Sequence, residues 1–296
     1  MQVFKVRHLT RYRYAQPVRL GEHRMMLRPR DDADQTLLAQ RLDISPTPQA
    51  LDLSRDAHGN WVAHARFGAP ARELKVESEI EVARVPAPRP EPTPPGRRAP
   101  LAGSDPLVTN WALAALDRAG WDGREPPDAE ALAVLCRSIH AGLAYRRRLE
   151  PGVQPPLRTL ELGAGACRDF AMLMIVAARG FGLPARFASG YVHLPSAAAA
   201  EASADTTGGH THAWASILTP DRGWIDFDPT SGLTGPQGLI RVAVADDPGD
   251  ASPISGVWFG QRADFLGMDV EVDVRAHTGV AFRPPSEEPL PPPGVA

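Results

Sequence analysis

Apolar and polar residues alternate through much of the first 85 residues, with the period of two that is typical of half-buried strands. The clearest run places Leu74, Val76, Ile80 and Val82 on one face, with charged residues between them. A glycine and an asparagine at the end of residues 56–60 predict a hairpin turn between two further apolar runs. Residues 1–85 are therefore expected to form a β-rich domain.

The apolar period changes to that of helices after residue 104. Ser104 or Asp105 is the expected N-cap of the first helix, and Pro106 suits its first turn. A second helix follows, and it has one apolar face: Leu132, Leu135, Cys136 and Ile139. Cys136 is then most simply a small buried hydrophobic residue.

Two proline-rich stretches divide the chain. Residues 86–103 read as a semi-rigid linker, and residues 284–296 read as a disordered tail. Between them, residues 104–283 are expected to form the core domain, which includes the C-terminal strands. The expected fold class is α+β.

Composition and charge exclude several classes of protein. A chain of 296 residues with 43% hydrophobic content can bury a core. Its 32 basic and 35 acidic side chains give a formal net charge of −3, so a nucleic-acid partner is not expected. Two cysteines exclude a disulfide framework and a four-cysteine zinc site. With no signal-like or membrane-spanning stretch in the sequence, we expect a cytoplasmic protein without a membrane partner.

Cys167 lies where a glycine-rich turn enters an apolar segment that runs to Gly180. It is therefore expected at a helix N-terminus, where unpaired amides and the helix dipole lower the pKa of a thiol and can hold an oxyanion. The alternative is a small buried residue at a helix–sheet contact, and the turn-then-helix context alone does not separate the two.

A second hairpin carries a histidine and an aspartate. If Leu218 pairs with Trp224 across the loop 219–223, His212 and Asp228 become diagonal neighbours on one face of the sheet. Asp226 shares that face but lies one step farther away. Asp228 is therefore the expected partner of the imidazole, and the alternative is an aspartate that caps the turn at 229–232.

Four blocks of this sequence, in order, resemble the transglutaminase-like superfamily, specifically its bacterial transglutaminase-like cysteine protease family. The blocks are residues 165–171 around Cys167, residues 182–191, residues 211–214 around His212, and residues 223–230 around Asp228. Three earlier segments resemble the β-rich domain that precedes the core in that family: residues 14–18, 27–30 and 56–60.

The resemblance implies a papain-like core in which the helix bearing Cys167 packs on an antiparallel sheet bearing His212 and Asp228. It also implies that Cys167 is the nucleophile, His212 the general base and acid, and Asp228 the third member of a triad. Trp214 and Trp224 are expected on the same sheet face, where they pack or line the substrate site. His210 and His212 share a strand face, but with no third histidine nearby we expect no metal and no cofactor.

The leading functional hypothesis is an amide hydrolase or peptidase that acts on a peptide or protein through a thioester acyl-enzyme. Transamidation shares every step up to that thioester, so the three residues do not separate the two reactions. An acyltransferase with an activated thioester donor also fits a Cys-His-Asp triad. A binding module whose triad does no chemistry is the alternative from a different class.

Overall fold

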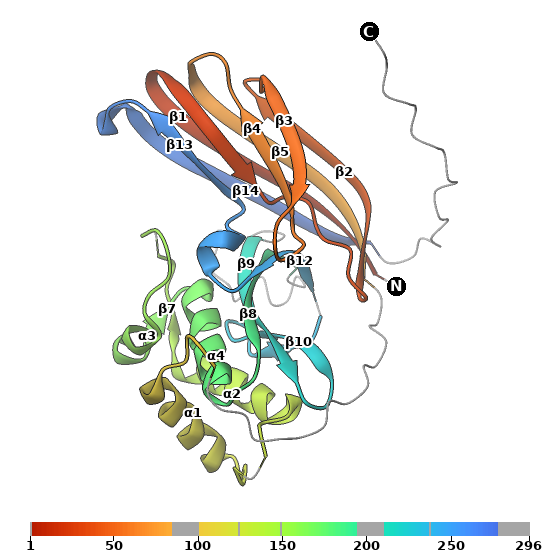
Figure 1. Ribbon diagram of the computed structural model, residues 1–296, viewed down its shortest axis with the longest axis vertical. Helices are drawn as coiled ribbons and strands as arrows, with labels where there is room; N and C mark the ends of the chain where they lie inside the picture. Colours follow the sequence, from red (N-terminus) through yellow and green to blue (C-terminus); the bar gives the residue numbers. More distant parts are fainter. Residues whose placement is uncertain are drawn as a thin grey trace.

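The computed structural model describes residues 2–84, 101–193 and 210–277, apart from positions 124, 149 and 237. A large β-sheet forms one part of the molecule, and a mixed helical and β core forms the other (Figure 1). The expected α+β organisation is therefore present. The prolines of the predicted linker and the predicted tail lie outside the described residues.

A single long strand, β1 (Gln2–Met25), organises the β-rich part. The sheet has the order β2-β5-β1-β4-β3, and β13 and β14 also pair with β1. The other strands are β2 (Gln35–Ser45), β3 (Ala50–Arg55), β4 (Trp61–Arg66), β5 (Ala71–Arg84), β13 (Ile254–Phe259) and β14 (Phe265–His277). The predicted alternation is confirmed, since Leu74, Val76, Ile80 and Val82 are all buried. The predicted hairpin is β3 and β4, which pair antiparallel.

The last two strands of the chain return to the N-terminal sheet. β14 pairs antiparallel with residues 3–14 of β1, and β13 pairs with residues 19–25. The sequence interpretation grouped these strands with the core at 104–283, and in this respect it was wrong. Its boundaries otherwise stay a prediction. The physical reason is that so long a strand offers free backbone groups over its whole length, and distant strands can satisfy them.

The described part of the core contains four α-helices. They are α1 (Pro106–Arg118), α2 (Ala129–Gly142), α3 (Pro156–Leu162) and α4 (Cys167–Gly180). Asp105 caps α1 by accepting from the backbone N–H groups of Leu107 and Val108, as its position before a proline predicted. α4 is the central helix because α1, α2 and α3 all contact it.

A five-stranded antiparallel sheet completes the core, in the order β11-β10-β9-β8-β12. Its strands are β8 (Ala185–Val192), β9 (His210–Thr219), β10 (Gly223–Asp228), β11 (Leu233–Thr234) and β12 (Leu239–Ala245). The remaining short elements are β6 (Ala144–Tyr145), β7 (Ala164–Gly165) and the 3-10 helices η1 (Pro248–Ala251) and η2 (Arg262–Asp264). α4 packs against β8 and β9, and most of its apolar side chains are fully buried.

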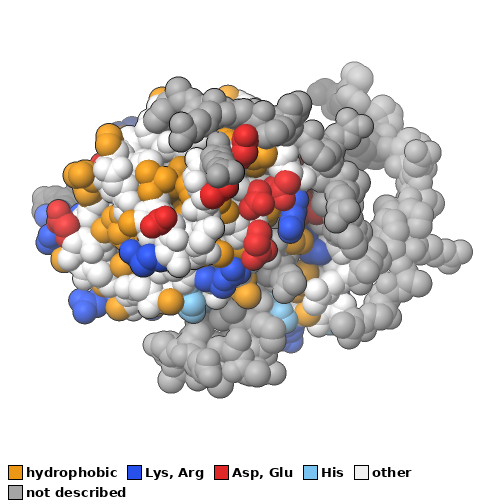
Figure 2. All heavy atoms as spheres, turned by 90° about the horizontal axis from the view of Figure 1, so that it is seen from below, with side chains coloured by type: hydrophobic (Ala, Val, Ile, Leu, Met, Phe, Trp, Pro, Cys, Tyr) orange, Lys and Arg blue, Asp and Glu red, His pale blue; other side chains and the backbone are white. Residues whose placement is uncertain are grey.

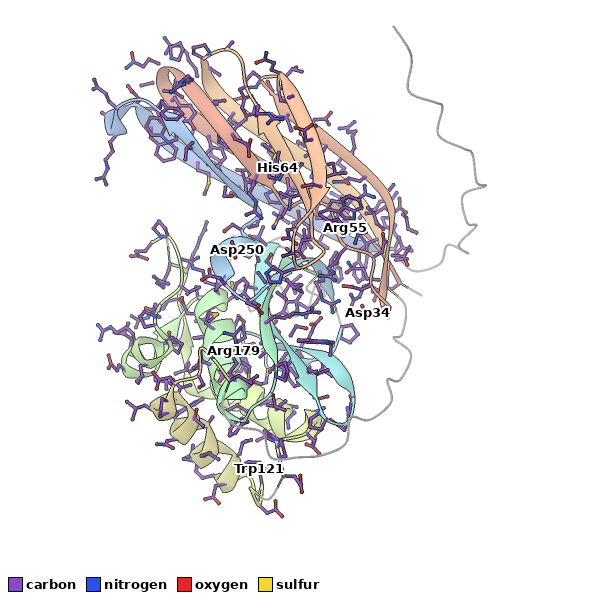
Figure 3. The ribbon with its side chains drawn as sticks, viewed as in Figure 1. Asp34, Arg55, His64, Trp121, Arg179 and Asp250 are labelled. Atoms are coloured by element: carbon purple, nitrogen blue, oxygen red, sulfur yellow. The ribbon has the colours of Figure 1, made fainter. Side chains whose placement is uncertain are left out.

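Side-chain amides join the two parts by imitating strand pairing. Asn60 accepts from the backbone N–H of Val244 at 2.9 Å and donates to its carbonyl at 2.7 Å. Gln35 does the same with Arg241, at 2.9 Å and 2.7 Å. Asp34, labelled in Figure 3, lies where the loop between β1 and β2 reaches the core. The core strand β12 is thus fixed to the N-terminal sheet.

The surface carries charges of both signs. In the view of Figure 2, acidic and basic side chains both occur among hydrophobic and polar ones, and neither sign covers that face. Within the described parts of the chain, no helix has the length and apolar character needed to span a bilayer.

Candidate active site

The N-terminus of α4 presents Cys167. The preceding residue Ala166 is the N-cap, and its methyl side chain cannot accept a hydrogen bond from the first turn. Asp169 in that turn accepts from the backbone N–H of Ala166. The first amides of an α-helix have no partner within the helix. Cys167 is a free, half-buried cysteine at this end of the helix. The sequence predicted this placement from the glycine-rich turn.

His212 reaches the same place from β9. It lies opposite Gly190 of β8 in the strand register, and its side chain is buried. A side chain at Gly190 is excluded, because a Cβ there would lie 2.0 Å from the carbonyl oxygen of Ile240 and 3.1 Å from the Trp214 ring. The missing side chain at Gly190 therefore lets β8, β12 and the Trp214 ring approach closely beside His212.

Asp228 is the carboxylate that meets the imidazole. Its Oδ2 lies 2.9 Å from His212 Nε2, and both side chains are almost wholly buried. The predicted hairpin register is confirmed, with Trp224 opposite Leu218 and the pairing continuing to Phe227 opposite Ala215.

The turn after β10 orients the Asp228 carboxylate. Thr230 donates its backbone N–H to Oδ1 at 3.0 Å, and the Ser231 hydroxyl donates to Oδ2 at 2.6 Å. The two interpretations of Asp228, as a turn cap and as the partner of His212, are therefore both correct. Ser231 was not identified from the sequence, because a serine in a turn is too common to indicate a site.

The three side chains shift one another's acidity. Burial raises the pKa of the Cys167 thiol, but the hydrogen bond and charge of His212 and the amide of Ala213 outweigh it, so the pKa lies below its ordinary value. Burial lowers the pKa of His212, and the Asp228 carboxylate and the Cys167 sulfur reverse this, raising it to about 10. Burial opposes the ionised form of Asp228, yet His212 holds its pKa below the usual range. The arrangement favours a thiolate–imidazolium pair.

Asp226 belongs to a different set of contacts. Its carboxylate pairs with the guanidinium of Arg241, which also meets Asp32 at 2.8 Å and Asp34 at 3.4 Å. The group lies in the interior, with Asp226 almost inaccessible. Asp226 therefore supports the contact between the two parts of the molecule, and Asp228 alone of the two aspartates meets His212.

The two tryptophans behave differently. Trp214 has no exposed surface, and its ring stacks on His212 with centroids 6.2 Å apart. It packs beside the imidazole and offers no surface to a substrate in this structure. Trp224 is 44% exposed and lies beneath the Arg186 guanidinium, 4.1 Å from its ring centroid. A substrate-lining role for Trp224 stays a prediction.

His210 adds a second imidazole at the start of β9. Its ring meets His212 edge to face, with centroids 5.5 Å apart. Burial, together with the charge of His212, lowers its pKa to about 4, so it is neutral at physiological pH. Among the described residues, no three side chains of the His, Cys, Asp or Glu types are grouped as a metal site would need.

Two further residues border the site without any sequence signal of their own. Tyr145 lies on β6, which pairs with β7 just before Cys167. Burial and the nearby charge of Cys167 raise its pKa. His140, at the end of α2, contacts the carbonyl of Thr230 through Nδ1 at 2.8 Å and so supports the turn that follows Asp228. Only the fold brings either residue to the site.

Comparison with known proteins agrees with this architecture. Residues 4–83 match the bacterial transglutaminase-like N-terminal region, and residues 118–229 match the transglutaminase-like superfamily. A solved structure from Cytophaga hutchinsonii, described as a "putative cysteine protease", superposes with a TM-score of 0.63 at 18% identity. The alignment covers 96% of this chain and 93% of that one, so the two share a fold.

Relatives in sequence extend over nearly the whole chain. An uncharacterized protein of Mycobacterium tuberculosis is 30% identical over 304 aligned residues, which cover 94% of each chain. An uncharacterized protein of Mycobacterium leprae is 28% identical, over 90% of this chain and 97% of its own length. With both matched regions in order and a relative this similar over 94% of its length, the chain belongs to the transglutaminase-like superfamily, in the bacterial form that carries a β-rich N-terminal region.

Proposed function

We propose that this protein is a cysteine-dependent amide hydrolase that acts on peptide or protein substrates through a thioester acyl-enzyme. One observation carries the proposal: the buried contact of 2.9 Å between His212 Nε2 and Asp228 Oδ2, beside a thiol whose pKa is lowered by the same imidazole. Cys167 is the nucleophile, His212 the general base and acid, and Asp228 the residue that orients the imidazole.

In the first half-reaction the Cys167 thiolate attacks the carbonyl carbon of the amide. The first N–H groups of a helix have no partner within it, so those at the start of α4 can stabilise the oxygen that becomes negative. The imidazolium of His212 then gives its proton to the departing nitrogen as the C–N bond breaks. The products are a free amine and a thioester on Cys167, and His212 is left neutral.

In the second half-reaction His212 takes a proton from water, and the resulting hydroxide adds to the thioester carbonyl. The C–S bond breaks, the carboxylic acid leaves, and the thiolate–imidazolium pair is restored. Asp228 keeps Nε2 protonated throughout, which leaves Nδ1 to exchange the proton on the side of the thiol. This tautomer is the one that both half-reactions require.

Hydrolysis is proposed over transamidation because water is present at about 55 M. An amine competes with water only if the site binds the amine or if the greater nucleophilicity of the amine makes up for its lower concentration. The sequence also has no pattern of spaced Asp and Asn residues like the calcium loops that regulate many animal transglutaminases. The proposal therefore names the carboxylic acid as the main product.

The test is to incubate the protein with a glutamine-containing peptide library and a low-millimolar primary amine. Mass spectrometry then separates free acid from amine adduct over one time course. Free acid as the main product supports the proposal, and adduct as the main product replaces it with transamidation. The Cys167→Ala variant is the control, and equal product formation by that variant would end the assignment of the nucleophile.

A further inference from the structure

The first turn of α4 contains an electrostatic conflict. Asp169 lies two residues after Cys167, and an acidic side chain there is favourable for the positive end of the helix dipole. An uncompensated negative charge in the same turn would disfavour a thiolate at Cys167, because like charges repel each other. If Cys167 is to ionise readily, another group must offset the charge of Asp169.

Arg148 supplies that group. Its guanidinium donates from one nitrogen to both carboxylate oxygens of Asp169, at 2.8 Å and 3.0 Å. Asp169 has no exposed surface, and the Arg148 side chain is only 18% exposed. The pair is therefore poorly screened by solvent, and each charge depends on the other.

The Asp169 carboxylate also fixes the backbone just before the thiol and that of a neighbouring segment. It accepts from the N–H of Ala166, the residue before Cys167, at 2.8 Å. It accepts from the N–H of Gln154 at 2.7 Å, which ties in the segment that leads to α3. One carboxylate thus sets the turn that presents Cys167 and anchors a neighbouring loop.

Arg168 holds the same loop from the other side. Its guanidinium donates to the carbonyl oxygens of Gly152 and Glu150, both at 2.6 Å, and to that of Arg148 at 3.3 Å. The consecutive side chains at 168 and 169 therefore bind the backbone of residues 148, 150, 152 and 154 beside the helix terminus that carries the thiol.

We propose that Arg148 and Asp169 are positioning residues of the Cys167 site, with Arg148 neutralising the buried carboxylate so that the helix terminus can favour the thiolate. This inference rests on the proposed function, since it explains how the nucleophile is kept ionised. Neither residue touches the reacting atoms. Both act through the backbone and the electrostatic field around Cys167.

Other charged groups also face the thiol and stay constant in the test. His212 on β9 and Asp228 on β10 act on it directly. The charge of Cys167 raises the pKa of Tyr145 on β6, after burial, and the charges of Arg147 and Arg168 lower it. Arg148 also lies 3.7 Å from the carboxylate of Glu150, but that carboxylate is largely exposed, so the loss of Arg148 acts mainly on the buried charge of Asp169 and can be separated from these groups.

The test measures the rate at which iodoacetamide labels Cys167 as a function of pH, in the full-length chain. Arg148→Met keeps much of the side-chain volume but leaves Asp169 uncompensated, so the midpoint of the rate profile should rise by about one pH unit. Adding Asp169→Asn to this variant removes both charges and should return the midpoint close to that of the wild type. The thermal stability of the double variant should stay low, because an amide cannot accept all the hydrogen bonds that the carboxylate accepts.

Arg158→Met is the matched control. Arg158 forms an exposed pair with Glu161 at 3.0 Å on α3, and its loss should leave the labelling profile unchanged. If Arg148→Met folds and its midpoint stays at the wild-type value, the proposal is overturned and the pair is only structural. If Arg148→Met does not fold, Asp169→Asn decides the matter, because its midpoint should stay level or fall, and a rise would overturn the proposal.

The two proposals fail in different ways. A wild-type Cys167 that labels no faster than a model thiol at neutral pH contradicts the proposed function. The difference in midpoint between Arg148→Met and the wild type can still be measured in that case, because any thiol titrates. A wild-type thiol that is reactive, with a midpoint insensitive to Arg148, rejects the positioning role alone.

Discussion

The two cysteines of the chain have opposite surroundings. Cys167 is half-buried at the N-terminus of α4, where His212 holds its pKa below the ordinary value. Cys136 lies fully buried on the apolar face of α2, where burial and the charge of Asp228 raise its pKa far above that value. At neutral pH a thiol with a lowered pKa is the more ionised of the two, and the thiolate is the reactive form.

We therefore expect brief iodoacetamide treatment at neutral pH to label Cys167 and leave Cys136 unmodified. Lowering the pH through the pKa of Cys167 should slow its labelling, because the thiolate is lost on that side. Peptide mapping by mass spectrometry measures both sites in one sample, and labelling in denaturant is the control that exposes both thiols. Preferential labelling of Cys136 in the folded protein would remove Cys167 as the nucleophile.

The two buried aspartates of β10 provide a second test at this scale. Asp228 meets His212, whereas Asp226 meets Arg241. Asp228→Asn should lower kcat by about 10² to 10⁴-fold, since an amide can stabilise the wrong imidazole tautomer and carries no charge to hold the imidazolium. Asp226→Asn should retain most of the activity and lose stability instead. Steady-state rates and thermal melts on both variants separate the two effects, and equal loss of activity would contradict the assignment.

Much of this residue-level arrangement could be predicted from the sequence, because a strand period of two fixes which residues share a face. The pairing of Trp224 with Leu218 follows from the short loop between them, and it brings His212 near Asp228. The burial of Trp214 and the ion pair of Asp169 with Arg148 could not be predicted. Each depends on a partner from another element, and no local pattern reports such a partner.

At the scale of single elements, the turn after β10 controls the Asp228 carboxylate. Gly232 closes this turn with φ of +72°, a conformation that a side chain disfavours by about 1 to 2 kcal/mol. A Cβ there would also lie 3.1 to 3.3 Å from the His140 ring of α2. Glycine at position 232 is therefore favoured both by the backbone conformation and by the lack of space for a side chain.

Gly232→Ala should reduce stability by about 1 to 2 kcal/mol through the backbone conformation. It should also lower kcat, because the displaced turn carries the Thr230 and Ser231 donors to Asp228. Gly235→Ala is the matched control, since Gly235 has φ of +93° but nothing within 4 Å of the added carbon. Urea denaturation and steady-state kinetics should show a similar loss of stability in both variants, with a loss of kcat in Gly232→Ala alone. An unchanged kcat in Gly232→Ala would show that the turn does not orient Asp228.

Element identities were predicted more readily than element partners. The cap at Asp105, the helix that begins at Cys167 and the hairpin of β9 and β10 all have local signals, namely an acceptor before a proline, a glycine-rich turn, and a loop of turn residues. The pairing of β13 and β14 with β1 has none. Those strands are separated from β1 by more than two hundred residues, and their alternation fits either sheet.

At the scale of the whole molecule, a buried cluster of charges joins the N-terminal sheet to the strand that carries Asp228. Arg241 of β12 binds Asp226 of β10 together with Asp32 and Asp34 of the N-terminal part. Arg84, at the end of β5, adds a contact of 2.9 Å to Asp34. The β-rich region is therefore part of the framework of the site, which gives a physical reason for the two regions to occur in one chain.

Removing Arg241 should test how strongly this cluster stabilises the molecule. Arg241→Met leaves Asp226 buried beside an apolar side chain, and the loss of one partner of a buried ion pair costs about 3 to 5 kcal/mol. In this variant Asp32 still pairs with Arg30 at 3.1 Å, and Asp34 still pairs with Arg84. The uncompensated charge is therefore mainly that of Asp226. The double variant Arg241→Met, Asp226→Asn should then recover about 1 kcal/mol or more relative to Arg241→Met, as expected for two coupled sites.

Urea denaturation followed by circular dichroism measures each free energy of unfolding. Arg222→Met, which breaks an exposed pair with Asp221 at 3.2 Å, is the control and should change that energy by less than about 1 kcal/mol. If Arg241→Met costs no more than this control, the cluster contributes little to joining the two parts, and the amide contacts of Asn60 and Gln35 together with the shared hydrophobic core hold them instead.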